Sequence, residues 1–93
     1  MRIRTNEAVK VLTVYDPDKG RTIPHRIKWQ NEVHTIRNIS YYHRERRGRN
    51  MFHIYHVNDG SFDFRILCDS ESLSWKLEEV VDGMIDGTNI LAK

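Results

Sequence analysis

The chain has 93 residues, of which 39% are hydrophobic and 30% are charged, and its formal net charge is +2. This length predicts one domain with a modest core, and it excludes a nucleotide-binding fold joined to a separate substrate domain. No apolar run approaches the roughly 18 residues of a membrane helix, and residues 1–10 lack the apolar stretch of a signal peptide.

The single cysteine, Cys68, has no partner for an internal disulfide and gives no zinc framework. The sequence shows no repeat, no low-complexity tract and no linker. We therefore expect one soluble, cytoplasmic domain over residues 1–93, with its core at about residues 8–82 and a loose tail over residues 83–93.

Two strands are predicted on either side of an early turn. Residues 8–15 form a strand because apolar positions alternate there, at Val9, Val11, Thr13 and Tyr15. Asp16-Pro17-Asp18-Lys19-Gly20 has the composition of a turn. The next strand has one apolar face, formed by Ile23, His25, Ile27 and Trp29, and one basic face that contains Arg26 and Lys28. Pro24 lacks an N–H group and belongs at a strand start or an edge.

The middle of the chain is rich in β-forming residues but changes phase. Gln30-Asn31-Glu32 predicts a tight reversal, because Asn tolerates left-handed backbone geometry. Val33, Ile36 and Ile39 are three residues apart and cannot share one face of a regular strand. A bulge near residues 35–38 restores the phase of this strand.

Asn58-Asp59-Gly60-Ser61 is the strongest turn signal in the chain, because Asp-Gly between two β-rich runs favours a type I′ hairpin. With Asp59 and Gly60 as a two-residue loop, Val57 is predicted to face Phe62 across the hairpin. The apolar faces of residues 51–57 and 62–68 then form one surface.

Residues 70–84 fit two templates. Helical spacing matches Leu73, Leu77, Val80, Val81 and Met84, with Gly83 as a cap. Strand spacing matches Leu73, Trp75 and Leu77. We favour the strand, because the helix leaves Trp75 on a polar face.

The elements together predict an all-β fold. We expect a small antiparallel meander of five to six strands, because each strand is joined to the next by a short turn. Its sheet edges must be covered or closed. At this length, a strongly bent sheet or a small barrel of the SH3-like or OB-like kind meets that requirement. The large aromatic residues are expected in the core, namely Trp29, Tyr55, Phe62, Phe64 and Trp75.

The segment Pro24-His25-Arg26-Ile27-Lys28-Trp29-Gln30-Asn31-Glu32-Val33 resembles a motif in a family of small uncharacterised bacterial domains. These domains carry a Pro, an apolar-x-Trp strand, a polar turn, an aromatic hairpin and a late Trp-x-Leu strand. The later counterparts here are residues 51–66 and Trp75-Lys76-Leu77, so the resemblance covers about residues 22–80. It implies a small all-β domain and a strand at residues 73–80. The family has no assigned activity, so it implies no functional residue.

The charges divide unequally along the chain. Residues 1–49 carry twelve Lys or Arg residues against five acids, whereas residues 50–93 carry three against eight. This division predicts one basic and one acidic face, which suits an anionic partner. The alternative is that a folded sheet interleaves the two halves, so that the charges meet as cross-strand pairs.

The segment from Tyr41 to Arg49 combines four arginines with two tyrosines. Arginine binds phosphate oxygens with two parallel hydrogen bonds, and tyrosine rings stack on unpaired bases. The candidate phosphate contacts are Arg44, Arg46, Arg47 and Arg49, assisted by Arg26, Lys28 and Arg37, with Tyr41 or Tyr42 stacking on bases. The alternative is a solvated hairpin tip whose charges prevent aggregation while a tyrosine packs inward.

The sequence offers no metal site, no cofactor site and no catalytic constellation. Five histidines are present, but no H-x-H pair or second cysteine accompanies them. On a strand, His53 and His56 point to opposite faces, and His25 and His53 lie on faces that we interpret as apolar. Cys68 ends an apolar alternation and is expected to be a small buried thiol.

Two hypotheses for function follow. The first is a non-catalytic module that binds single-stranded nucleic acid, or an acidic protein surface, through a basic loop predicted from Arg44 to Arg49. The second is a protein-interaction or self-assembly module that pairs through an open edge strand, for example Val9 to Tyr15. Neither hypothesis involves a membrane.

Overall fold

Residues 2–82, the part that this computed structural model describes, fold into eight strands without a helix. The strands are β1 (Arg2–Ala8), β2 (Lys10–Asp16), β3 (Arg21–Trp29), β4 (Glu32–Thr35), β5 (Asn38–Arg47), β6 (Asn50–Asn58), β7 (Phe62–Asp69) and β8 (Trp75–Asp82). The predicted all-β class is confirmed, and the strand favoured over the helix is present as Trp75–Asp82, although Leu73 precedes it, exposed and with a φ angle of 62°. The predicted tail, residues 83–93, lies outside the described residues.

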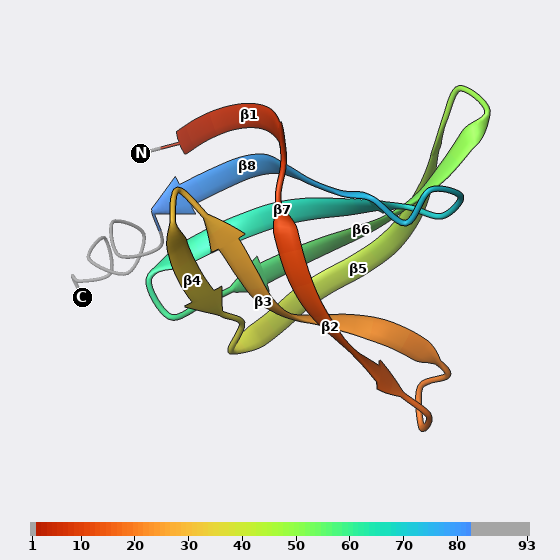
Figure 1. Cartoon of the computed structure of the whole chain (residues 1–93), viewed down its shortest axis with the longest axis horizontal. Coiled ribbons are helices and arrows are strands. Elements are labelled where there is room, and N and C mark those ends of the chain that lie inside the picture. Colours follow the sequence, from red (N-terminus) through yellow and green to blue (C-terminus); the bar gives the residue numbers. More distant parts are fainter. Residues whose placement is uncertain (1, 83–93) are drawn as a thin grey trace.

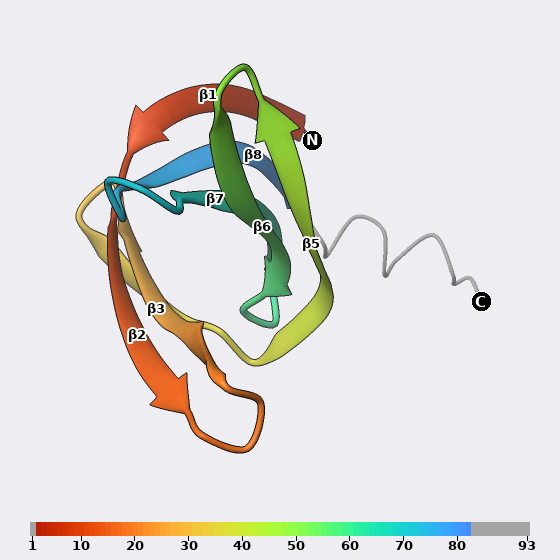
Figure 2. The same ribbon diagram turned by 90° about the vertical axis from the view of Figure 1, so that its right-hand side faces the viewer.

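The strands form two antiparallel sheets, and at both edges the chain passes directly from an edge strand of one sheet into an edge strand of the other. One sheet has the order β1-β8-β7-β6-β5 and the other has the order β2-β3-β4. Edge strand β1 continues into β2 through Val9, and β4 continues into β5 through Ile36 and Arg37. The strands therefore follow one another around a small barrel, as Figures 1 and 2 show. Eight strands are present instead of five or six for two reasons. Strand β1 was not predicted, and the stretch from Val33 onward, predicted as one strand with a bulge, is divided into β4 and β5.

The phase change after β4 marks the passage between the two sheets. The N–H of Ile36 donates to the carbonyl of His25 in β3 at 2.9 Å, and the N–H of Arg37 donates to the carbonyl of Asn58 in β6 at 2.8 Å. The N–H groups of two consecutive residues thus form hydrogen bonds to strands of different sheets. The bulge expected near residues 35–38 is replaced by this crossing, although a register shift does follow at Ser40, between Ile39 and Tyr41.

An irregularity in β3 moves His25 away from the core. Leu12 pairs with Arg26, but the next residue, Thr13, pairs with Pro24, so His25 is left as the extra residue of a bulge. The bulge reverses the alternation, and consequently Pro24 is buried while His25 is exposed. The prediction of His25 on the apolar face was wrong, because the pattern cannot show where such a bulge falls.

The β6–β7 hairpin has a longer loop than predicted. Val57 pairs with Phe64 instead of Phe62, because the Asp59 carboxylate closes the loop with its own hydrogen bonds. Its Oδ1 accepts the N–H of Ser61 at 2.8 Å and that of Phe62 at 2.7 Å. The register differs by two residues from the predicted one, so the same side chains still share the apolar face.

The loop at Asp59 also closes one end of the barrel. His34 of β4 and Asp59 form a hydrogen bond of 2.8 Å between Nδ1 and Oδ2, and both side chains are nearly buried. The His34 ring packs against Phe64 with 5.1 Å between ring centroids. Next to them, the core draws its buried side chains from both sheets: Ile27, Trp29, Tyr55, Val57, Phe64, Ile66, Leu77 and Val80.

The tight reversal predicted at Gln30-Asn31-Glu32 is present as a two-residue turn, in which Gln30 and Asn31 have φ angles of 52° and 64° and Glu32 already belongs to β4. Asn accepts this left-handed geometry, whereas Gln does so at a cost of about 1 kcal/mol. We expect Gln30→Gly to stabilise the protein by about 0.5 kcal/mol, after the greater freedom of glycine in the unfolded chain is subtracted. Urea unfolding measures the change. The same substitution at exposed Glu32, within β4, should destabilise the protein instead, and a loss of stability in Gln30→Gly would contradict the assignment of strain.

Candidate nucleic-acid interface

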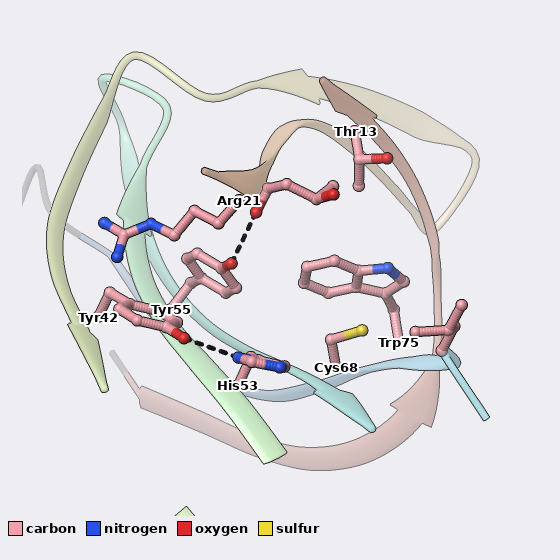
Figure 3. A pocket seen from close by; sticks show the side chains of 9 residues that line it. Thr13, Arg21, Tyr42, His53, Tyr55, Cys68 and Trp75 are labelled. Carbon is pink, nitrogen blue, oxygen red and sulfur yellow. Dashed lines mark hydrogen bonds between the residues drawn. The ribbon is translucent and has the colours of Figure 1, made fainter. Parts of the chain in front are cut away.

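A cavity of about 390 Å³ lies between the β2–β3 hairpin and the ends of β5, β6, β7 and β8. Figure 3 shows the side chains that line it. Four of these side chains are aromatic rings, namely Tyr42, His53, Tyr55 and Trp75, and the others are Thr13, Arg21, Thr22, Cys68 and Leu73. We call this cavity the aromatic mouth. Its lining contains no carboxylate, and its volume lies in the range of small-molecule sites.

Hydrogen bonds and ring contacts fix the positions of the aromatic side chains that line the mouth. The Tyr42 hydroxyl and His53 Nδ1 form a hydrogen bond of 2.7 Å, and the Tyr55 hydroxyl donates to the carbonyl of Thr22 at 2.8 Å (Figure 3). The Tyr42 and Tyr55 rings lie 4.8 Å apart, and the Arg21 guanidinium carbon lies 4.4 Å from the centre of the Tyr42 ring. These contacts join the β2–β3 hairpin to the large sheet and shape the cavity before any ligand enters.

Three titratable groups of the mouth have pKa values shifted in the direction that favours their neutral forms. Burial, together with the charge of Arg44, lowers the pKa of His53. Burial also raises the pKa of Tyr55 to about 12 and raises the pKa of the Cys68 thiol. At neutral pH, Arg21 is therefore the charged group in the lining. A neutral aromatic wall with one cation suits a planar ring that carries, or is attached to, an anion.

The state of Cys68 can be measured directly, because it is the only cysteine of the chain. Its side chain is buried, with 7% of the residue exposed, and its thiol is protonated at neutral pH. We expect iodoacetamide to alkylate Cys68 roughly tenfold more slowly in the folded protein than in guanidinium chloride. Mass spectrometry of timed samples gives both rates, and equal rates would show an exposed thiol instead.

Strand β5 extends the mouth with a line of basic residues. The register between β5 and β6 is unbroken from Tyr41 to Arg47, so Tyr42, Arg44 and Arg46 lie on one face of the strand. Arg44 is directly opposite His53. Arg44, Arg46 and Arg49 are exposed, and none of them forms an ion pair within residues 2–82. We call these three arginines the basic strip.

Arg47 lies on the opposite face of β5 and has carboxylate partners. Its two terminal nitrogens donate to Glu78 of β8, at 2.7 and 3.3 Å, and its Nε donates to Glu45 at 2.6 Å. These bonds raise the pKa of Arg47, and the guanidinium in turn lowers the pKa of Glu78. Glu78 also lies 3.1 Å from Nε of Arg65. Arg47 thus joins β5 to β8, and two carboxylates already bind its guanidinium group.

No family model, curated protein or solved structure matches the chain. The assignment of a site therefore rests on the geometry of this structure.

The remaining predicted site residues lie elsewhere. Tyr41 stacks on His43 on the outer face of β5, with 5.1 Å between ring centroids. Arg26 and Lys28 are exposed on β3, and the β3–β4 turn and the tip of the β5–β6 hairpin lie at opposite ends of the long axis (Figure 1). Arg37 lies beside Gly60. Of the nine residues, Tyr42, Arg44 and Arg46 thus share one face of β5 and Arg49 lies in the turn that follows, whereas Arg26 and Lys28 lie on β3.

The sequence did not predict that Arg21, Tyr55 and Trp75 line a cavity. Tyr55 and Trp75 were expected only in the core, and Arg21 was not considered. One signal was present, since His53 and Cys68 interrupt an apolar face with titratable groups. Within residues 2–82 the histidines form no metal cluster with Cys, Asp or Glu, and no helix there could span a membrane.

Proposed function

We propose that the protein is a non-catalytic module that binds single-stranded nucleic acid. A base enters the aromatic mouth, and the neighbouring phosphates lie along the basic strip. The observation that carries this proposal is the sequence of Tyr42, Arg44 and Arg46 on one face of β5, which runs from the cavity onto the exposed hairpin. Proteins that bind single strands combine aromatic platforms with a basic path in this way.

The chemistry of the mouth supports a base as the occupant. Base–aromatic stacking contributes about 1–3 kcal/mol per base. Tyr42 and Trp75, which are partly exposed, offer ring surfaces, and the lining holds no carboxylate that would repel a phosphate. Arg21 adds a cation at the rim of Tyr42. A base within a duplex is stacked and paired, so this arrangement favours single strands over duplexes.

Fluorescence anisotropy with a labelled oligonucleotide tests the proposal. We expect binding of a mixed-sequence single strand at about 50 mM salt, with log K falling by roughly 0.7 per phosphate contact as log salt rises. A duplex of the same sequence should bind more weakly. The oligonucleotide should also slow the alkylation of Cys68, which lines the mouth. Binding that ignores salt, or that leaves the alkylation rate of Cys68 unchanged, would refute the proposed site.

A further inference from the structure

Strand β2 is an open edge with an exposed apolar face. It pairs with β3 on one side and is the last strand of its sheet. Three of its large apolar residues are unusually exposed: Leu12 by 53%, Val14 by 50% and Tyr15 by 62%. An edge strand of this kind presents unpaired backbone groups to other chains. Natural edges are protected by Pro, a short length or inward-pointing charges, and residues 11–15 contain none of these features.

We propose that a second copy of this chain pairs with β2 in antiparallel fashion, around a twofold axis at Thr13. This register places Thr13 opposite Thr13, Leu12 opposite Val14, Val11 opposite Tyr15 and Lys10 opposite Asp16. Each residue meets a residue of the same face, because the partners differ by an even number of positions. The interface is therefore isologous, as closed dimers require.

The charges of the strand favour this occupant. Within its own sheet Lys10 lies directly opposite Lys28, and two like charges in such a pair are destabilising. Lys10 forms no ion pair with any residue between 2 and 82. Asp16 Oδ1 accepts a hydrogen bond from the N–H of Asp18 at 2.9 Å. The other carboxylate oxygen, Oδ2, can therefore pair with the ammonium group of a lysine. The pairing supplies each Lys10 with an Asp16, and it does so twice in the dimer.

The pairing also covers apolar surface and bears on the aromatic mouth. Leu12 and Val14 of one copy lie beside Val14 and Leu12 of the other, on the outer face of the joined sheet. Thr13 points to the other face and lines the mouth. In the dimer, the two aromatic mouths therefore lie on either side of the paired β2 strands. This arrangement allows one single-stranded nucleic acid to occupy both mouths.

Disulfide trapping tests the register. In a Cys68→Ser background, Thr13→Cys should crosslink readily under mild oxidation, because directly opposite Cα atoms lie about 4.5–5.5 Å apart, within disulfide range. Leu12→Cys and Val14→Cys should crosslink much more slowly, since each faces the other residue. Crosslinking of Leu12→Cys or Val14→Cys in preference to Thr13→Cys would overturn the register. Absence of crosslinks in all three, with a monomer at every concentration in sedimentation equilibrium, would overturn the dimer.

Charge exchange tests the ion pairs. Lys10→Glu should weaken the dimer about tenfold, because two favourable pairs become repulsive. Lys10→Glu combined with Asp16→Lys should restore most of the affinity. The matched control is Glu32→Lys on β4, the opposite edge of the same sheet, which should leave the affinity unchanged. Circular dichroism confirms folding of the double variant, and equal affinities for Lys10→Glu and the wild-type protein would refute the pairing.

Discussion

Reversing Arg44 and Arg46 to glutamate should weaken the binding of a single-stranded oligonucleotide by about 100-fold at low salt. Both arginines lie on the face of β5 that carries Tyr42, and no carboxylate of the described chain is paired with them. In the proposed binding mode, each reversal removes a phosphate contact and adds repulsion of the nucleic-acid backbone. The slope of log K against log salt should also decrease, because fewer counterions are released on binding.

The matched control is the double variant Arg26→Glu and Lys28→Glu, which changes the net charge of the protein by the same amount. These residues lie on β3, on the far side of the molecule from the tip of the β5–β6 hairpin (Figure 1). We expect its affinity to change by less than about threefold, through long-range electrostatics alone. Anisotropy titrations of both variants decide the matter. Equal losses would indicate a general attraction of a basic protein and not a site.

A loop was predicted from Arg44 to Arg49, whereas Arg44 to Arg47 continue strand β5. Alternation along a strand separates residues 44 and 46 from residue 47, and this separation follows from the sequence once the strand is known. The partner of Arg47 does not follow from it. Glu78 is 31 residues away, and it reaches Arg47 only because β5 to β8 lie in one sheet. Local alternation thus gives the face only after the strand is known, and the long-range pairing gives Arg47 its carboxylate partner.

Turns and bulges limited the prediction of the fold in a similar way. The reversal at Asn31 was predicted because a single residue type determines the backbone geometry there. At Asp59 the side chain competes with the two-residue turn by accepting two backbone N–H groups, and the composition Asp-Gly is compatible with both outcomes. The bulge at His25 is equally hidden, since it depends on the pairing of β3 with β2.

The aromatic mouth illustrates a further limit. Alternation assigns Tyr55 and Trp75 to the inner face, and the structure places them there. It does not show that the barrel is filled at the end with Trp29 and Phe64 and hollow at the end with Tyr42 and His53. At the hollow end, β2 and β5 are edge strands of different sheets, and neither pairs with a strand of the other sheet. A cavity is a property of several strands together, so no single strand reveals it.

Replacing Asp59 with alanine should destabilise the protein by about 3 kcal/mol at neutral pH. The substitution removes the acceptor of two backbone N–H groups in the β6–β7 loop and the partner of His34. The two side chains are only 9% and 11% exposed, so water cannot fully replace the lost hydrogen bonds. Asp59→Asn keeps an oxygen acceptor and should cost only about 1 kcal/mol. Urea unfolding at neutral pH measures both values.

The dependence on pH gives an independent test of the same group. Burial acts to raise the pKa of Asp59, but the N–H groups of Phe62 and Ser61 and the nearby His34 outweigh it, so the pKa lies below its ordinary value. A carboxylate with a lowered pKa stabilises the fold above its unfolded pKa of about 4, and this contribution is lost as pH falls through the folded pKa. The stability difference between the wild-type protein and Asp59→Asn should therefore shrink as pH decreases from about 5 to about 2. A difference that stays constant over this range would mean that the charge of Asp59 contributes nothing, and that its hydrogen bonds to the loop alone hold the end of the barrel closed.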